Sequence, residues 1–190
     1  MTTEGELYDY YLPDELLATI REKFDVKTLV RELVEKCRGK DPTEIEKLAS
    51  QILGERLKES IKAAIEVGEK VLDRTAEWIY KVAQKTGIRF PSVPQRFIEA
   101  HFMAARKNDK YEIRASTPSF MEFEVKRCEI FDLLRKSLGD DAMRSMPCRY
   151  GCILASKTLF EALKFDVEIL RHSEMSKDGK CRIEIKLKSG

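Results

Sequence analysis

The sequence of 190 residues predicts an α+β fold, with a helical N-terminal half followed by an antiparallel sheet of two β-hairpins flanked by helices. In the first half, apolar residues recur at spacings of three and four, the period of a helix. After residue 109 the period changes to two, the period of a strand. Pro91 and Pro94 mark a joint between the halves. We therefore expect a helical region (1–90) and an α+β region (91–190) that pack as one compact unit.

The bounds of the helices in the first half are predicted from the residues that typically begin and end a helix. Pro13 opens the first helix, since proline is tolerated in the first turn. Asp25 can cap a second, which ends at Arg38-Gly39-Lys40, the basic residues and glycine that helix C-termini prefer. Asp41-Pro42 begins the next helix, and from Glu55 an apolar stripe continues to about Lys85.

The segment 95–107 fits a helix better than a strand, because its aromatic and alanine residues group on neighbouring helix faces. It ends in the basic run 104–110. We interpret this run as a solvated helix end, which needs no nucleic acid to explain it.

Alternating apolar and polar residues predict the two hairpins. The first turns at Thr117-Pro118 and buries one face, which leaves Glu122 and Glu124 on the solvated face. The second contains an Asp178-Gly179 turn. Between the hairpins, one helix follows Cys128 and another runs from Cys148 to Leu163.

Charge and hydropathy limit the partners. Lys and Arg total 35 against 33 Asp and Glu, a net charge of +2, which argues against a large nucleic-acid footprint. No apolar run approaches the roughly 20 residues that span a bilayer. The acidic start MTTEGELYDYY is not a signal peptide. We therefore expect a cytoplasmic protein without a nucleic-acid or membrane partner.

Four of the five cysteines lie in the last third of the chain, at Cys128, Cys148, Cys152 and Cys181. In a reducing cytosol such thiols are more often buried groups, metal ligands or nucleophiles than disulfides. Cys148 and Cys152 are four apart, which places both on one face of a helix, and four thiolates suit zinc or an iron–sulfur cluster. The spacing matches no standard zinc finger, so four buried thiols are the alternative. Cys37 lies on an apolar helical stripe and is expected in the core.

A second interpretation makes one cysteine a nucleophile. Pro147 supports a helix start at Cys148, and a thiol of Cys148 or Cys152 near a helix N-terminus would have a lowered pKa. The two candidate bases are His101 and His172. A structural or surface role is the alternative for both histidines.

From about Phe120 the order is strand, cysteine, helix ending at Leu138-Gly139-Asp140, cysteine pair, helix, strand, Asp-Gly turn, and a closing strand Cys181-Arg182-Ile183-Glu184-Ile185. Over roughly 97–187 this order resembles the L-2-amino-thiazoline-4-carboxylic acid hydrolase-like family and the related 4-vinyl reductase-type domains. The resemblance implies an antiparallel sheet flanked by helices, with a small-molecule pocket or a metal held partly by the closing cysteine. It also implies zinc on cysteines at positions like Cys128 and Cys181.

Three hypotheses remain open from the sequence. The first is a cytosolic metal-binding domain that holds zinc or an iron–sulfur cluster on the four cysteines and binds a small ligand between sheet and helices. The second is a cysteine-dependent hydrolase of a small C=N or amide-like substrate, without metal. The third is a ligand-sensing module that forms a homodimer through its N-terminal helices. The sequence identifies neither the substrate nor the residues that contact a ligand.

Overall fold

Four strands form one antiparallel sheet in the order β1-β2-β4-β3. The computed structural model describes residues 14–70, 85, 90–145 and 148–188. The strands are β1 (Lys110–Thr117), β2 (Phe120–Arg127), β3 (Val167–Ser173) and β4 (Cys181–Leu187). The two predicted hairpins join where β2 pairs with β4, with Val125 opposite Cys181. The fold class is α+β, as the change of period predicts.

The N-terminal helices are α1 (Asp14–Lys23), α2 (Val26–Cys37) and α3 (Pro42–Lys70). The predicted start of α1 at Pro13 lies outside the described residues, whereas α2 and α3 begin at the caps that the sequence indicates. Asp25 accepts hydrogen bonds from the backbone N–H groups of Lys27 and Thr28, and Asp41 does the same at the start of α3. Helix α3 continues without a break through residues 54 and 55. The predicted continuation toward Lys85 lies, beyond residue 70, outside the described residues except for Lys85 itself.

The second half supplies five more helices within the described ranges. These are α5 (Ser92–Ala104), α6 (Glu129–Leu138), α7 (Asp140–Ser145), α8 (Cys148–Ala162) and α9 (Met175–Asp178). The helix predicted for 95–107 and the one predicted to begin at Cys148 are confirmed. In place of the predicted tight turn at Asp178-Gly179, the chain forms the short helix α9. This helix ends at Gly179, whose φ of 66° lies in the left-handed region.

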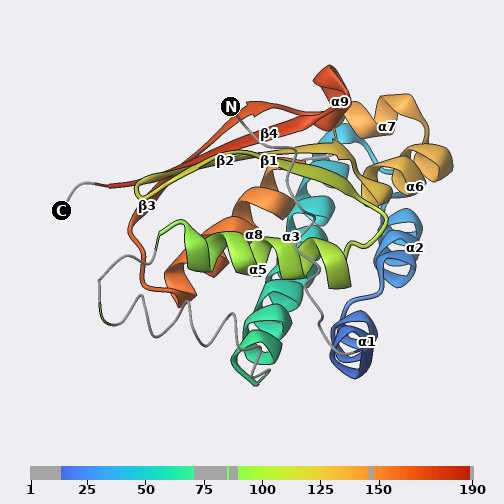
Figure 1. Ribbon diagram of the computed structural model, residues 1–190. Helices are drawn as coiled ribbons and strands as arrows, with labels where there is room; N and C mark the ends of the chain where they lie inside the picture. Colours follow the sequence, from blue (N-terminus) through green and yellow to red (C-terminus); the bar gives the residue numbers. More distant parts are fainter. Residues whose placement is uncertain (1–13, 71–84, 86–89, 146–147, 189–190) are drawn as a thin grey trace.

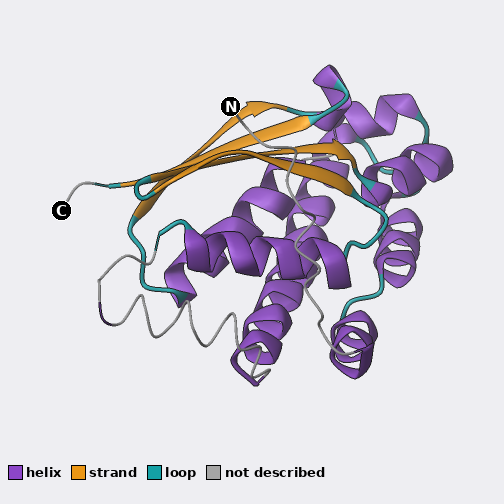
Figure 2. Ribbon diagram, viewed as in Figure 1, coloured by secondary structure: helices purple, strands orange, loops and turns teal. Residues whose placement is uncertain are grey.

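The core lies between the sheet and the helices on one of its faces. Figure 1 shows α5 and α8 beneath the sheet, with α3 running steeply past them, and Figure 2 shows the same separation of strands from helices. Met121, Phe123 and Val125 of β2 and Ile183 and Ile185 of β4 point into this core and are at most 3% exposed. The alternation in the sequence therefore assigns the inner face of both central strands correctly.

The outer face of the sheet differs from the expectation in one respect. Glu122 and Glu124 are only 6% and 3% exposed. Arg182 pairs with Glu122 at 2.7 Å, and Arg114 and Lys180 pair with Glu124 at 2.9 and 3.2 Å. The long basic side chains lie over the carboxylates and shield them from water, because arginine and lysine stems cover surface while their charged ends remain hydrated. The prediction of two solvated glutamates is wrong for this reason.

No helix among the described residues is both long enough and apolar enough to cross a membrane.

Candidate functional site

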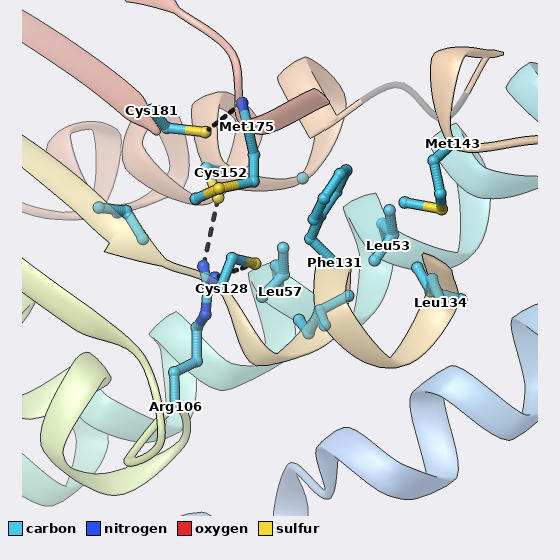
Figure 3. Close-up of a pocket in the computed structure, with 13 residues that line it drawn as sticks. Leu53, Leu57, Arg106, Cys128, Phe131, Leu134, Met143, Cys152, Met175 and Cys181 are labelled. Atoms are coloured by element: carbon cyan, nitrogen blue, oxygen red, sulfur yellow. Dashed lines mark hydrogen bonds between the residues drawn. The ribbon is translucent and has the colours of Figure 1, made fainter. Parts of the chain in front are cut away.

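A cavity of about 30 Å³ lies where the paired ends of β2 and β4 meet α3, α6 and α8 (Figure 3). Its wall is almost entirely apolar. The larger side chains that form it are Leu53, Leu57, Phe131, Leu134, Met143 and Met175. Gly151 of α8 is also part of the wall, and a Cβ atom built there would lie 2.8 Å from Leu57 Cδ1. The glycine thus lets α8 approach α3 closely beside the cavity.

Three of the four clustered cysteines line this cavity. Cys128 lies between β2 and α6, Cys152 lies in α8, and Cys181 begins β4. Cys148 begins α8, but its side chain lies outside the described part of the molecule. Cys37 is buried in α2 at 1% exposure and is a core residue, as expected.

Arg106, just after α5, is the charged residue of the cavity wall. It is 2% exposed. Its Nη1 donates to Cys152 Sγ at 3.2 Å and its Nη2 donates to Cys128 Sγ at 3.0 Å. Figure 3 shows the side chain extended toward both thiols. The guanidinium also lies 5.1 Å from the centre of the Phe102 ring, close enough for a cation–π contact.

Asp109 supplies the charge that balances Arg106. Its Oδ2 lies 2.5 Å from Arg106 Nη2, and the two side chains are 1% and 2% exposed. Its Oδ1 accepts a hydrogen bond from the backbone N–H of Glu129 at 2.8 Å, which ties the pair to the first residue of α6. Burial raises the pKa of Asp109, and the positive charge of Arg106 opposes that rise.

The same two opposing effects act on the pKa of the Cys128 thiol. Burial raises its pKa above the ordinary value, and the guanidinium of Arg106 opposes the rise. The Cys128 side chain is therefore a neutral thiol at neutral pH that already faces a fixed positive charge.

The expectation that run 104–110 is a solvated helix end is wrong for Arg106 and Asp109. A signal was present in the sequence, because the two opposite charges are three residues apart directly after an apolar helix. Charged residues are almost never fully buried without a partner, and Arg106 and Asp109 are each other's partner.

The predicted zinc or iron–sulfur cofactor is not supported. Within the described side chains, no group of three or more His, Cys, Asp or Glu is arranged to hold a metal ion. The guanidinium of Arg106 already supplies a positive charge and hydrogen bonds to both Cys128 and Cys152. Cys181 Sγ accepts a hydrogen bond from the backbone N–H of Met175 at 3.2 Å. The prediction of a zinc or iron–sulfur cofactor is therefore wrong, and the predicted set of four cysteines did not include the arginine that contacts two of them.

The cysteine-dependent hydrolase interpretation requires a histidine base beside the thiol, and neither histidine is placed to act as one. His101 Nδ1 lies 3.2 Å from Ser60 Oγ, and burial, assisted by Arg106, lowers the His101 pKa to about 3. His172 pairs with Glu184 at 3.0 Å on the other face of the sheet. Neither histidine lines the cavity. Cys152 therefore has no histidine beside it to accept its proton, and the nucleophile interpretation is not supported.

Comparison with known proteins returns structural likenesses and no sequence family. No protein-family model and no curated protein matches the chain. Among solved structures, similar chains include a Cs H-NOX variant carrying 4-cyano-L-phenylalanine, at 14% identity and a TM-score of 0.35, covering 93% of this chain and 94% of that one. An H-NOX mutant from T. tengcongensis is similar at 15% identity and a TM-score of 0.33, covering 93% and 95% of the two chains. A third similar chain comes from a structure that probes heme distortion in the H-NOX family. It is 14% identical to this chain with a TM-score of 0.33, and the match covers 92% of each chain.

The family predicted from the sequence is not supported, because no family model matches the chain. The similar structures found are H-NOX domains and not thiazoline hydrolase-like or 4-vinyl reductase-type proteins. The order of short motifs that carried the resemblance is an order of elements in a sheet flanked by helices. Such an order does not identify a family, because unrelated sequences share it.

Proposed function

We propose that this chain is a small-molecule-binding domain whose ligand occupies the cavity beside Arg106. One observation carries the proposal: protein interiors are normally packed without voids larger than a water molecule, yet this core holds a cavity of about 30 Å³. Binding sites are typically hollow, mostly apolar and provided with a few polar groups that orient the ligand. Arg106 and the three thiols are such groups here.

The chemistry of the wall favours a neutral and mainly apolar ligand. Among the described lining residues Arg106 alone is charged, and Asp109 already balances it. The Nε of Arg106 is buried and has no hydrogen-bond partner in the described structure. One acceptor atom on the ligand would satisfy that N–H, and an unpaired buried donor is costly enough to favour such a contact.

The cavity volume limits the ligand to a few non-hydrogen atoms. A volume of 30 Å³ is that of about two water-sized probes. A larger ligand would require the wall to move. Met143 and Met175 are the side chains best suited to this, because methionine is flexible and adapts to irregular space.

A porphyrin does not fit these residues. Pockets for drug-sized ligands occupy roughly 300–1,000 Å³, far more than this cavity. Neither described histidine lines it, and the two thiols nearest its polar end are engaged by Arg106. The described residues that line this cavity therefore do not form a heme site.

Xenon is a suitable first probe, because apolar cavities bind it without needing a hydrogen bond. The protein is labelled with ¹³C in its methionine methyl groups, and spectra are recorded under increasing xenon pressure. We expect saturable shifts for Met143 and Met175, which line the cavity. Met121 is buried at 0% exposure outside the cavity wall and serves as the internal control.

Two isoleucine variants separate filling of the cavity from general overpacking. Val125→Ile adds a methylene group at the cavity wall and should weaken the xenon shifts. Val30→Ile adds the same group in the buried part of α2, away from the cavity, and should leave them unchanged. Equal xenon shifts in both variants, or shifts spread evenly over all methionines, would refute the proposed site. Small alcohols and thioethers then test whether a ligand with one acceptor atom binds more tightly than xenon.

A further inference from the structure

Cys128 and Cys152 come from different elements and share one guanidinium. Arg106 donates to Cys128 Sγ at 3.0 Å and to Cys152 Sγ at 3.2 Å. The terminal N–H groups of an arginine are fixed in one plane, so both sulfur atoms lie at the tip of the same rigid fork (Figure 3). Two thiols in this arrangement are neighbours although they lie 24 positions apart in the sequence.

We propose that Cys128 and Cys152 are a redox site that small peroxides convert to a reversible disulfide. One thiol gives its proton to the peroxide and its sulfur attacks an oxygen, so that the O–O bond breaks, one water leaves and a sulfenic acid forms. The second thiol then attacks that sulfur, the S–O bond breaks and a second water leaves. With hydrogen peroxide, two thiols and one peroxide thus become one disulfide and two waters. The two electrons lost by sulfur reduce the peroxide.

The surroundings favour a small oxidant. Both thiols line the cavity, whose volume of about 30 Å³ suits a molecule the size of hydrogen peroxide, roughly that of two waters. A bulky disulfide oxidant would not enter without displacing the wall. The fixed positive charge of Arg106 stabilises the thiolate that forms when the proton leaves, as basic groups do beside reactive cysteines.

Oxidation would change more than the two sulfur atoms. A disulfide bond would draw the two sulfur atoms together and away from the separate N–H groups of Arg106, so Arg106 would lose both contacts while Asp109 remained beside it. The new bond would join the residue that precedes α6 to α8. The redox state of this pair would therefore change the polar end of the proposed ligand cavity.

The sequence makes the disulfide easy to map. Trypsin cleaves after lysine and arginine, and this places each of the five cysteines in a separate peptide. Cys128 falls in residues 128–135 and Cys152 in residues 150–157. The full chain is reduced, exposed to hydrogen peroxide under conditions in which circular dichroism shows it folded, alkylated with iodoacetamide, digested and analysed by mass spectrometry. We expect a linked peptide joining these two segments, lighter by two hydrogen atoms than its parts and separated again by dithiothreitol.

Three single variants complete the test. Cys128→Ser and Cys152→Ser should each abolish the linked peptide, whereas Cys37→Ser, in α2 and outside the cavity wall, should leave its yield unchanged. The proposal is overturned if the linked peptide joins Cys152 to Cys148 or Cys181, if peroxide yields only sulfinic or sulfonic acids, or if the folded protein stays fully reduced. Xenon binding is measured separately, so failure of the disulfide and failure of the ligand cavity are distinguishable.

Discussion

Arg106 Nη2 lies 2.5 Å from Asp109 Oδ2, and the two side chains are 2% and 1% exposed. The pair places one positive and one negative charge in the core, within reach of two thiols. Water screens neither charge, so each depends on the other to offset the cost of burial. The pair also connects the end of α5 to the start of α6 through the Glu129 N–H.

Replacing Arg106 with methionine should destabilise the fold strongly. The Arg106→Met variant keeps much of the side-chain volume but leaves Asp109 buried without its counter-charge. Breaking a buried pair in this way costs about 3–5 kcal/mol. Urea unfolding would measure the loss, with Arg144→Met as the control, since the Arg144 side chain is 78% exposed and should change stability by less than about 0.5 kcal/mol.

The pair is tested further by a double variant. Arg106→Met combined with Asp109→Asn should cost less than the two single changes added together, because the second change removes the unpaired charge left by the first. A coupling of about 0.5–3 kcal/mol is typical of residues in contact. Strict additivity would contradict the inferred dependence of each charge on the other.

The stability of the protein should fall in mild acid because of His101. Burial, and next the charge of Arg106, lowers the His101 pKa from 6.5 to about 3. Between these two values the unfolded chain binds a proton that the folded chain excludes, so stability is lost as pH falls through this window. The full effect is roughly 5 kcal/mol. Urea unfolding between pH 7 and 4 would record roughly 3 kcal/mol of this effect.

The variant His101→Gln should flatten this pH dependence, whereas His172→Gln, on the other face of the sheet, should preserve it. The raised pKa of Asp109 acts in the opposite sense, since there the folded chain binds the extra proton and loses stability as pH rises. The informative quantity is therefore the difference in slope between each variant and the parent. An unchanged slope in His101→Gln would show that the histidine is not excluded from protonation.

Enlarging the cavity should cost stability and increase xenon binding together. Leu134 is 1% exposed and lines the cavity, so Leu134→Ala should destabilise by about 2–5 kcal/mol. The xenon shifts of Met143 and Met175 should grow in the same variant. Leu170, at 39% exposure, is the matched control, and Leu170→Ala should change neither quantity appreciably. A stable Leu134→Ala variant with unaltered xenon shifts would place the leucine outside the cavity wall.

Gly151→Ala should shrink the cavity at little cost in stability. The added Cβ would lie 2.8 Å from Leu57 Cδ1, so the leucine must move. Overpacking costs about 1–3 kcal/mol, and replacing a helical glycine by alanine returns roughly 1 kcal/mol. We expect a net loss of about 0–2 kcal/mol with weaker xenon shifts. Lys157→Ala, on the exposed side of the same helix, should leave the xenon shifts intact.

Local patterns in the sequence were enough to predict the elements. Asp25 and Asp41 cap the helices that follow them because a cap needs only the next two or three residues. The alternation in β2 and β4 assigns Met121 and Ile183 to the buried face, since a strand turns alternate residues to opposite sides. For the same reason Cys181 is expected to point inward, and it is 6% exposed.

The site itself depends on contacts that no local pattern contains. Arg106 contacts Cys128 and Cys152, which lie 22 and 46 residues further along the sequence. These contacts form only when α5, α6 and α8 pack against one end of the sheet. Periodicity reports which face of an element is apolar, but not which side chain from another element will meet it. The sequence by itself determined the α+β class and the inner faces of the strands. Only the tertiary structure decided that a buried arginine contacts two of the cysteines, because long-range packing sets which charge the thiols face.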